Sequence, residues 1–521
     1  MRVHRRAQRR EDPRATVRQL VRTALALEHE DPEVRRLLAV EALVACGEIE
    51  AGLADAGLDA LSIAAATDEL ATVVLGHRRH GRSAAAALER AELPDRLEVA
   101  TPAGFAYDGL HPESFACAME TLDVAMPVLV VGVRSIGTTL SAVLVAALRA
   151  WGASATRVTV RAQGPADDRD VSLGQRERDA VHRAHDIVIV DQGPGTSGAR
   201  FLAAAEAIVR EGVSPSRVRL MCSHPPNPRK LTAPDGAARW SAFRTVVAPD
   251  GVRAPDGVRD LSAGVWRRAH YDDESKWPAS FTTSERRKLV SASGDLVKYE
   301  GLGRTGRDAL ARARSLAAAG LAPSPRPVGD GWVAYPWRGR PLAALDRTPA
   351  LVDHLALYCA RRPELCPVPS SSSPVDLDAM VEHNLAVAFG VEIEHQPLSV
   401  VRPAIVDGRM MPHEWLRADD GAVLKVDGVA HGDDAFFPGP TDIAWDLAGA
   451  IVEWQLDAAA TERLLESYRR FSGDDARARI TRWLRAYKAF RLGLSAFARD
   501  QALGTPERGR LERDLERYIR T

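Results

Sequence analysis

The sequence predicts an α/β protein built on a doubly wound parallel sheet, and three observations support this prediction. Strands and helices alternate between residues 96 and 275, the run 187–190 is unbroken and β-branched, and a turn rich in glycine and hydroxyl groups follows it directly. An unbroken apolar run is typical of a strand buried on both faces, and strands that alternate with helices form parallel sheets. We expect a helical segment before this sheet and an α+β domain after it.

Length and composition indicate a folded chain of several domains. At 521 residues the chain is too long for a single core, while 45% hydrophobic and 27% charged residues are ordinary values for globular proteins. The formal net charge of -1 gives no bulk attraction to nucleic acid or to a membrane surface. No apolar window is long enough to predict a membrane span. We divide the chain into a helical segment (1–95), a sheet domain (96–278) and a C-terminal domain (279–521).

The cysteines and the N-terminus bear on the compartment and the partners. The five cysteines are odd in number, scattered and without a CxxC pair, which favours reduced thiols in a cytoplasmic protein over disulfides or zinc. The basic run 2–10 lacks a following apolar segment, so we interpret it as a solvated tail rather than as a secretory signal or a binding arm. The expected partners are small molecules, and the expected protein assembly, if any, is a homodimer.

The predicted elements follow from the spacing of apolar residues and from turn residues. In the helical segment, where packing is the favoured interpretation and no chemistry is visible, the predicted helices are 16–28, 32–46, 49–56 and 83–91. In the sheet domain the predicted strands are 127–133, 156–161, 187–190 and 218–223, and the predicted helices are 138–151 and 199–210.

A phosphate-binding turn is predicted after the 187–190 strand. Residues 195–198 (Gly-Thr-Ser-Gly) place free backbone N–H groups and hydroxyls at the start of a helix, where an anion is stabilised. Asp191 and Gln192 stand at the carboxyl end of the strand, where open α/β sheets bind ligands. We interpret the segment as a site for a phosphorylated sugar, and the alternative is a strand-to-helix turn with capping residues only.

Two further clusters are expected at the same edge of the sheet. The segment 131–138 is a strand that turns into a helix through a glycine-containing loop beside Arg134, which suits a diphosphate. Arg161 precedes the polar loop 162–173, and long polar loops in compact domains are often lids.

The segment 188–199 resembles the phosphoribosyl-pyrophosphate motif of type I phosphoribosyltransferases, and the loop 134–138 resembles the pyrophosphate loop of that family. The resemblance implies a phosphoribosyltransferase-like domain that uses phosphoribosyl pyrophosphate with Mg²⁺. It implies catalytic roles for Asp191, which would hold the ribose hydroxyls, and for Arg134. The implied binding residues are Arg134, Ser135, Gly137, Arg161, Asp191, Gln192, Gly195, Thr196, Ser197, Gly198 and Ala199.

One departure from this family and the acceptor site need separate mention. Gln192 stands where the family usually has a second acid, so it contributes no negative charge near the cationic sugar carbon. Tyr107, His111 and His224 lie in segments that mix aromatic or imidazole groups with turn residues, as a stacking pocket for a base would need. Ordinary loop corners are an equal interpretation for each of these three.

The C-terminal domain resembles the aminoglycoside phosphotransferase and choline kinase group. The resemblance depends on the order of a hairpin at 288–299, a strand and linker at 332–342, a second hairpin at 415–428, and the segment 440–449. It implies a bilobal, kinase-like α+β domain with ATP as co-substrate and Mg²⁺ as cofactor.

The resemblance also implies roles for single residues. Lys298 would pair with nucleotide phosphates, Tyr335 and Trp337 would lie beside the adenine, and Asp427 would bind Mg²⁺. Asp446 would steady the catalytic loop. The His-Gly-Asp triplet of the family is missing before the second hairpin, so Asp407 is the candidate catalytic base if the loop is two residues longer. Glu414 falls at the family's Asn position, as a second candidate metal ligand.

The sequence thus predicts a phosphoribosyltransferase that forms or cleaves a glycosidic bond to a base-like acceptor. Its kinase-like domain would phosphorylate a related metabolite. The alternative is a regulator that binds phosphoribosyl pyrophosphate and ATP without turnover.

Overall fold

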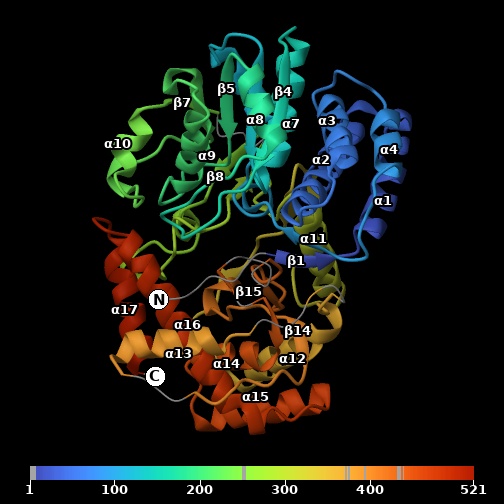
Figure 1. Cartoon of the computed structure of the whole chain (residues 1–521). Coiled ribbons are helices and arrows are strands. Elements are labelled where there is room, and N and C mark those ends of the chain that lie inside the picture. The colour runs from blue at the N-terminus through green and yellow to red at the C-terminus, as the bar shows by residue number, and fades with distance from the viewer. Residues whose placement is uncertain are drawn as a thin grey trace. The chain divides into compact units, whose positions relative to one another are not determined.

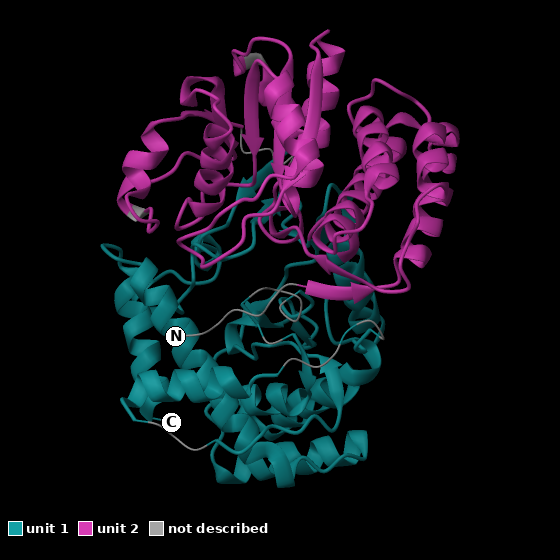
Figure 2. Cartoon of the chain, viewed as in Figure 1, with its two compact units in different colours: residues 1–7, 255–300, 305–521 teal, residues 8–254, 301–304 magenta. Residues whose placement is uncertain are grey.

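The computed structural model describes residues 8–248, 254–369, 372, 376–391, 395–430, 436–437 and 439–520. The chain divides into two compact units (Figure 2): unit 1 comprises residues 1–7, 255–300 and 305–521, and unit 2 comprises residues 8–254 and 301–304. The helical residues 8–95 thus share a unit with the sheet, and residues 255–278 belong with the C-terminal region. No helix in the described parts of the chain is long and apolar enough to cross a membrane.

Unit 2 is built on a parallel sheet of order β4-β3-β5-β6-β7 (Figure 1), which confirms the predicted parallel sheet. Its strands are β3 (Val128–Val133), β4 (Ala155–Val160), β5 (Asp186–Val190), β6 (Val218–Cys222) and β7 (Arg244–Val247). The chain runs outward from β3 to β4 and then returns past β3 to β5. The strand order therefore reverses between β3 and β5, and the carboxyl ends of these two strands flank the point where open α/β sheets bind ligands.

Helices cover both faces of this sheet. The helices α8 (Gln175–Arg183) and α9 (Ala199–Arg210) share one apolar core with β3, β4, β5 and β6. The helix α7 (Ile136–Ala150) packs on β3 and β4, and α2 (Pro32–Asp55) and α3 (Leu61–Val74) pack on α7. The remaining strands and α-helices of unit 2 are β1 (Gln8–Glu11), α1 (Pro13–Ala26), α4 (Arg82–Glu89), β2 (Leu97–Ala100), α5 (Ala103–Ala106), α6 (Ser114–Cys117) and α10 (Gly236–Ser241).

Two predictions for the N-terminal region are wrong. A single helix, α2, replaces the predicted helices 32–46 and 49–56, because Gly47 does not break it. A Cβ at Gly47 would lie 2.2 Å from Thr139 Oγ1 of α7, so this glycine permits close helix packing. Residues 8–10 are not a solvated tail, because β1 pairs with β2 and Arg9 Nη2 lies 2.6 Å from Glu48 Oε2. The rest of the predicted tail, residues 1–7, lies outside the described residues.

Unit 1 begins with an antiparallel sheet of order β11-β12-β10-β9-β8. Its strands are β8 (Val258–Asp260), β9 (Lys288–Ser291), β10 (Leu296–Tyr299), β11 (Arg326–Gly329) and β12 (Trp332–Tyr335). The helix α11 (Gly303–Ala318) follows β10. The hairpin predicted at 288–299 is confirmed, with strands at 288–291 and 296–299.

The rest of unit 1 is mainly helical and has a core rich in buried tryptophan. The helices are α12 (Pro349–Leu365), α13 (Asp378–Phe389), α14 (Ala444–Glu453), α15 (Ala458–Ser472), α16 (Arg477–Gln501) and α17 (Glu507–Arg520). Short strands form the pair β14 (Pro403–Ile405) and β17 (Pro440–Asp442), and the group β13 (Arg340–Pro341), β15 (Trp415–Arg417) and β16 (Val423–Lys425). The second predicted hairpin is therefore also confirmed.

Candidate functional site

The turn after β5 stands at the reversal point of the unit 2 sheet. Asp191 is fully buried there, and its Oδ1 accepts a hydrogen bond from the Gln192 amide at 2.8 Å. Its Oδ2 lies 3.2 Å from Arg200 Nη2 in the first turn of α9. Burial raises the pKa of Asp191, and the charge of Arg200 opposes that rise. The carboxylate is thus fixed at the edge of the sheet where a ligand is expected.

Part of this turn is bonded internally, since the Gly198 amide donates to the Pro194 carbonyl at 2.8 Å and the Ala199 amide donates to Ser197 Oγ at 3.3 Å. Gly195 and Gly198 have φ of 60° and 71°, a conformation that favours glycine. Gly195 and Thr196 are exposed, and α9 begins at Ala199. Ser197 Oγ donates a 2.9 Å hydrogen bond to the carbonyl of Ala166, so the polar loop 162–173 reaches the turn. The arrangement fits an anion site at the start of a helix.

The loop after β3 is strained. Ser135 has φ of 101°, which is rare for a residue with a Cβ. A Cβ at Gly132 would lie 2.3 Å from the carbonyl oxygen of Gly137, and one at Gly137 would lie 2.6 Å from that of Val190. The loop therefore packs directly on the end of β5. Strain of this kind persists where the surroundings enforce it and is common at ligand sites.

Arginines gather around these two turns. Arg161 Nε donates to Asp55 Oδ1 at 2.9 Å, and Arg134 Nη1 lies 3.3 Å from the same oxygen. Burial, with a smaller effect of the charges of Arg200 and Arg161, lowers the pKa of Arg169. Among the described residues, Arg169 has a carbonyl partner, Ala162 at 3.2 Å, and no carboxylate.

Asp55, the last residue of α2, was missed from the sequence. Nothing local marks it, because it lies in a segment interpreted as packing and meets Arg134 and Arg161 only in the folded chain.

The three predicted acceptor residues differ in accessibility. Tyr107 and His111 are buried, with 8% and 3% of their surfaces exposed, so neither offers an open ring face in this structure. His224 is exposed, and a Cβ at Gly193 would lie 2.4 Å from its Cε1, which puts the imidazole directly over the 191–199 turn. The side-chain amide of Gln192 donates a hydrogen bond to Asp108 Oδ2. Of the three, His224 is the one positioned to meet a ligand.

In unit 1 the predicted nucleotide lysine lies within an ion network. Lys298 on β10 is buried, and its Nζ lies 2.7 Å from Asp427 Oδ1 and 3.3 Å from Glu300 Oε1. Burial opposes its charge, but the carboxylates of Asp427 and Glu300 outweigh that effect and raise the pKa of Lys298. Glu300, the residue that follows β10, is a second buried carboxylate beside Lys298. Tyr335 is also buried and donates to Glu300 Oε1 at 2.9 Å.

Asp446 holds the loop after β14, which is the role that the kinase resemblance implied for it. Asp446 Oδ2 accepts from the amide of Asp407 at 2.8 Å, and its Oδ1 accepts from that of Gly408 at 3.1 Å. Burial raises the pKa of Asp446 to about 7. The Asp407 side chain is fully buried, and its Oδ2 accepts from the Tyr358 hydroxyl at 2.6 Å. The candidate base therefore faces the interior rather than a substrate.

Both predicted metal ligands of unit 1 lie against cations. Asp427 Oδ2 is 3.6 Å from Lys288 Nζ, in addition to the contact of Oδ1 with Lys298. Glu414 Oε2 is 2.8 Å from Lys425 Nζ, and its Oε1 pairs with Arg409. Across the described residues of either unit, no group of three His, Cys, Asp or Glu side chains is arranged to hold a metal ion.

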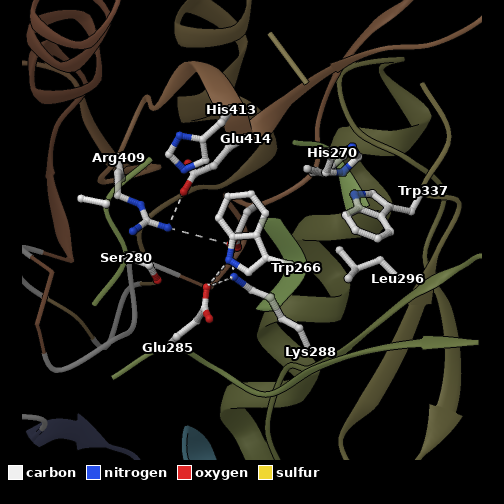
Figure 3. Close-up of a pocket in the computed structure, with 13 residues that line it drawn as sticks. Trp266, His270, Ser280, Glu285, Lys288, Leu296, Trp337, Arg409, His413 and Glu414 are labelled. Atoms are coloured by element: carbon white, nitrogen blue, oxygen red, sulfur yellow. Dashed lines mark hydrogen bonds and ion pairs between the residues drawn. The ribbon is translucent and has the colours of Figure 1, made fainter. Parts of the chain in front are cut away.

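A pocket that is partly open to solvent lies beside this network (Figure 3). Asp427, Lys288 and Arg409 line it together with aromatic side chains. Trp266 stacks on His413 with centroids 5.3 Å apart, and its Nε1 donates to Glu285 at 2.8 Å. The aromatic lining is Trp266, His270, Trp337 and His413. Trp337 lines this pocket, whereas Lys298 and Tyr335 are not among its lining residues.

The connection between β8 and β9, residues 261–287, supplies Trp266 to this pocket and was not foreseen. It is fixed to the last helix, because Arg267 donates to Glu507 of α17 through two hydrogen bonds of 3.0 and 2.9 Å. The amide of Ser280 also donates to Glu507, at 2.7 Å.

Unit 1 combines a five-stranded antiparallel sheet, an ion pair between Lys298 and Asp427, and a loop held by Asp446. No protein-family model matches the chain, and no curated protein is similar to it. Solved structures with a partial likeness include a choline/ethanolamine kinase family protein from Mesorhizobium loti (17% identity, TM-score 0.30, 45% of this chain and 84% of that one). Another is the choline kinase LicA from Streptococcus pneumoniae (12%, 0.31, 45% and 90%).

A third such structure is an aminoglycoside phosphotransferase from Alicyclobacillus acidocaldarius (12% identity, TM-score 0.29, 45% of this chain and 85% of that one). All three structures share only part of their fold with this chain.

Proposed function

We propose that the chain is a transferase of the phosphoribosyltransferase type, in which unit 2 binds phosphoribosyl pyrophosphate and joins its ribose to, or removes it from, a base-like acceptor. One observation carries the proposal. The strained Ser135 loop and the 191–199 turn meet at the reversal point of a parallel sheet, with Arg161, Arg169 and Arg200 close by. A helix N-terminus and arginines together suit a sugar bearing a phosphate and a diphosphate.

Each group in this site has a role in the proposed reaction. The Thr196 hydroxyl and the amides of Thr196 and Ser197 bind the 5-phosphate, and Asp191 accepts hydrogen bonds from the ribose hydroxyls. Arg134 and Arg161 neutralise the diphosphate as it leaves the anomeric carbon, which lowers the barrier through charge stabilisation. His224 lies where an acceptor ring can stack. Gln192 leaves the developing cation without a second carboxylate, so Asp191 alone supplies the negative charge.

The proposed Mg²⁺ fits this site only as a companion of the substrate. Asp191 Oδ2 is buried beside Arg200 and receives no well-directed hydrogen bond among the described residues, so a ligand can bond it once the site has opened. Mg²⁺ is commonly bound through one or two carboxylates together with substrate phosphates, and when bound it would neutralise the diphosphate.

Pyrophosphate release from phosphoribosyl pyrophosphate, measured with a panel of bases, tests the proposal. Wild type should release pyrophosphate with at least one acceptor, and Asp191→Asn should lose most of this activity. Arg200→Ala should weaken binding of phosphoribosyl pyrophosphate in calorimetry, whereas Arg210→Ala, at the other end of α9, should not. Absence of both binding and release in wild type would contradict the proposal.

For unit 1 we infer nucleotide binding, and the burial of Asp407 favours binding without turnover over phosphorylation of a metabolite. A base must reach the proton that it takes, and Asp407 is enclosed by Tyr358 and Lys425. ATP consumption by wild type and by Asp427→Ala distinguishes the two. Consumption that Asp427→Ala abolishes, with pyrophosphate release intact, would establish a kinase beside a separate transferase.

A further inference from the structure

Lys425 lies at the centre of the acidic residues of unit 1. It is the last residue of β16, and 1% of its side chain is exposed. Its Nζ lies 2.8 Å from Glu414 Oε2 and 3.3 Å from Asp407 Oδ1, and it also donates to the carbonyl oxygen of Asp427. Oxygens from three separate segments thus surround a single ammonium group.

These oxygens belong to the residues that a kinase-like unit would use for metal binding and catalysis. The other oxygens of the acids are also matched: Asp427 Oδ1 lies 2.7 Å from Lys298, its Oδ2 lies 3.6 Å from Lys288, and Glu414 Oε1 pairs with Arg409. A divalent ion entering here would meet several fixed positive charges at short range. Since like charges in a buried site repel strongly, the residues present do not fit Mg²⁺.

The ammonium group is also difficult to displace. Removing one partner from a buried ion cluster leaves an uncompensated charge, which is costly. Mg²⁺ requires near-octahedral oxygen coordination and loses its water reluctantly, so it competes poorly for oxygens already held by lysine.

We propose that Lys425 is a built-in cation that replaces the divalent metal ion in unit 1, and that the pocket of Figure 3 binds its ligand without a metal. The ammonium group is fixed to the oxygens of Glu414, Asp407 and Asp427. The pocket offers aromatic walls at Trp266 and Trp337, together with Lys288, which pairs with Glu285, and Arg409, which pairs with Glu414. A ligand with an aromatic ring and a phosphate group, free of metal, fits these features. The replacement of the metal ion by Lys425 does not depend on the function proposed for unit 2.

Binding of Mn²⁺ to the full chain, followed by electron paramagnetic resonance, tests the replacement directly. All variants carry Asp191→Asn, so that unit 2 does not contribute a metal site. With Lys425 present, no Mn²⁺ should bind in unit 1. Lys425→Met should gain one Mn²⁺ site, which adding Glu414→Gln should remove. Lys288→Met is the matched control, because it removes a cation near Asp427 from outside the oxygen cluster, and it should gain no site.

Two results would overturn the proposal. One is Mn²⁺ bound while Lys425 is present and lost on Asp427→Asn, and the other is a folded Lys425→Met protein that gains no site. If Lys425→Met does not fold, thermal shifts of wild type with AMP and ATP decide. Shifts of equal size in EDTA and in Mg²⁺ support metal-free binding, whereas shifts that require Mg²⁺, or no shift with either nucleotide, contradict it.

Discussion

In unit 2 the arginines around the reversal point outnumber the carboxylates that pair with them, whereas in unit 1 each candidate metal ligand has a lysine or arginine against it. Arg134 and Arg161 share Asp55, Arg200 has Asp191, and Arg169 has a carbonyl group. In unit 1 Asp427 lies within 4.0 Å of three cations, and Glu414 contacts two. Similar residue types thus form a site with charge left over for a ligand in one case and a closed network in the other.

The largest expected effect comes from removing a buried arginine of unit 1. Arg362 is fully buried, donates to the carbonyl oxygens of Ile405 and Gly428, and lies 3.6 Å from Asp446. Arg362→Met leaves a buried carboxylate uncompensated, so unit 1 should lose about 3–5 kcal/mol of unfolding free energy in urea titrations. The exposed neighbour Arg361, changed to Met, should cost about 0.5 kcal/mol or less. Equal losses from the two would show that the network does not stabilise unit 1.

A smaller effect is expected from adding a methyl group where the backbones of Gly132 and Gly137 approach closely in unit 2. Gly132→Ala puts a Cβ against the backbone of Gly137, so it should cost about 1–3 kcal/mol and weaken binding of phosphoribosyl pyrophosphate. Gly212→Ala, where nothing lies within 4 Å of the added Cβ, carries only the strain of its positive φ and should leave binding unchanged. Normal binding by Gly132→Ala would separate the loop from the ligand site. Calorimetry on both variants provides the measurement.

These elements also show how far sequence can lead. The strands at 288–291, 296–299 and 187–190 were predictable because apolar runs and turn residues are local signals. The two glycine turns were predictable for the same reason. Asp55, Glu300 and the partners of Lys425 were not, since ion pairing depends on contacts between distant segments. A motif therefore predicts where a charged residue lies better than it predicts whether that charge remains available.

The folded unit 1 disfavours the protonated form of His413, so its unfolding free energy should depend on pH. Burial, with the charges of Arg409, Lys288 and Lys425, holds the pKa of His413 well below 6.5. Unfolded chains bind a proton there below pH 6.5 and the folded unit does not, so stability is full above that pH and falls as the pH drops below it. The slope should be up to about 1.4 kcal/mol per pH unit. Urea titrations from neutral to acid pH should show His413→Gln losing this part of the slope.

The smallest expected effect is a gain. Asp55→Asn frees Arg134 and Arg161, so binding of pyrophosphate should strengthen by about 1 kcal/mol or less, as for exposed ion pairs. Asp59→Asn removes a charge but keeps the oxygen that accepts a hydrogen bond from the Leu61 amide, so it serves as the control in the same calorimetric titration. Weaker binding by Asp55→Asn would mean instead that Asp55 holds the arginines in their binding positions.

The contact between Arg267 and Glu507 joins positions 240 residues apart in the sequence. This contact links sequence variation in α17 to the pocket. A substitution in α17 can alter the pocket wall that carries Trp266, although no residue of that helix lines the pocket. Related chains that diverge in their final helix would thus differ in ligand preference while every pocket residue stays the same.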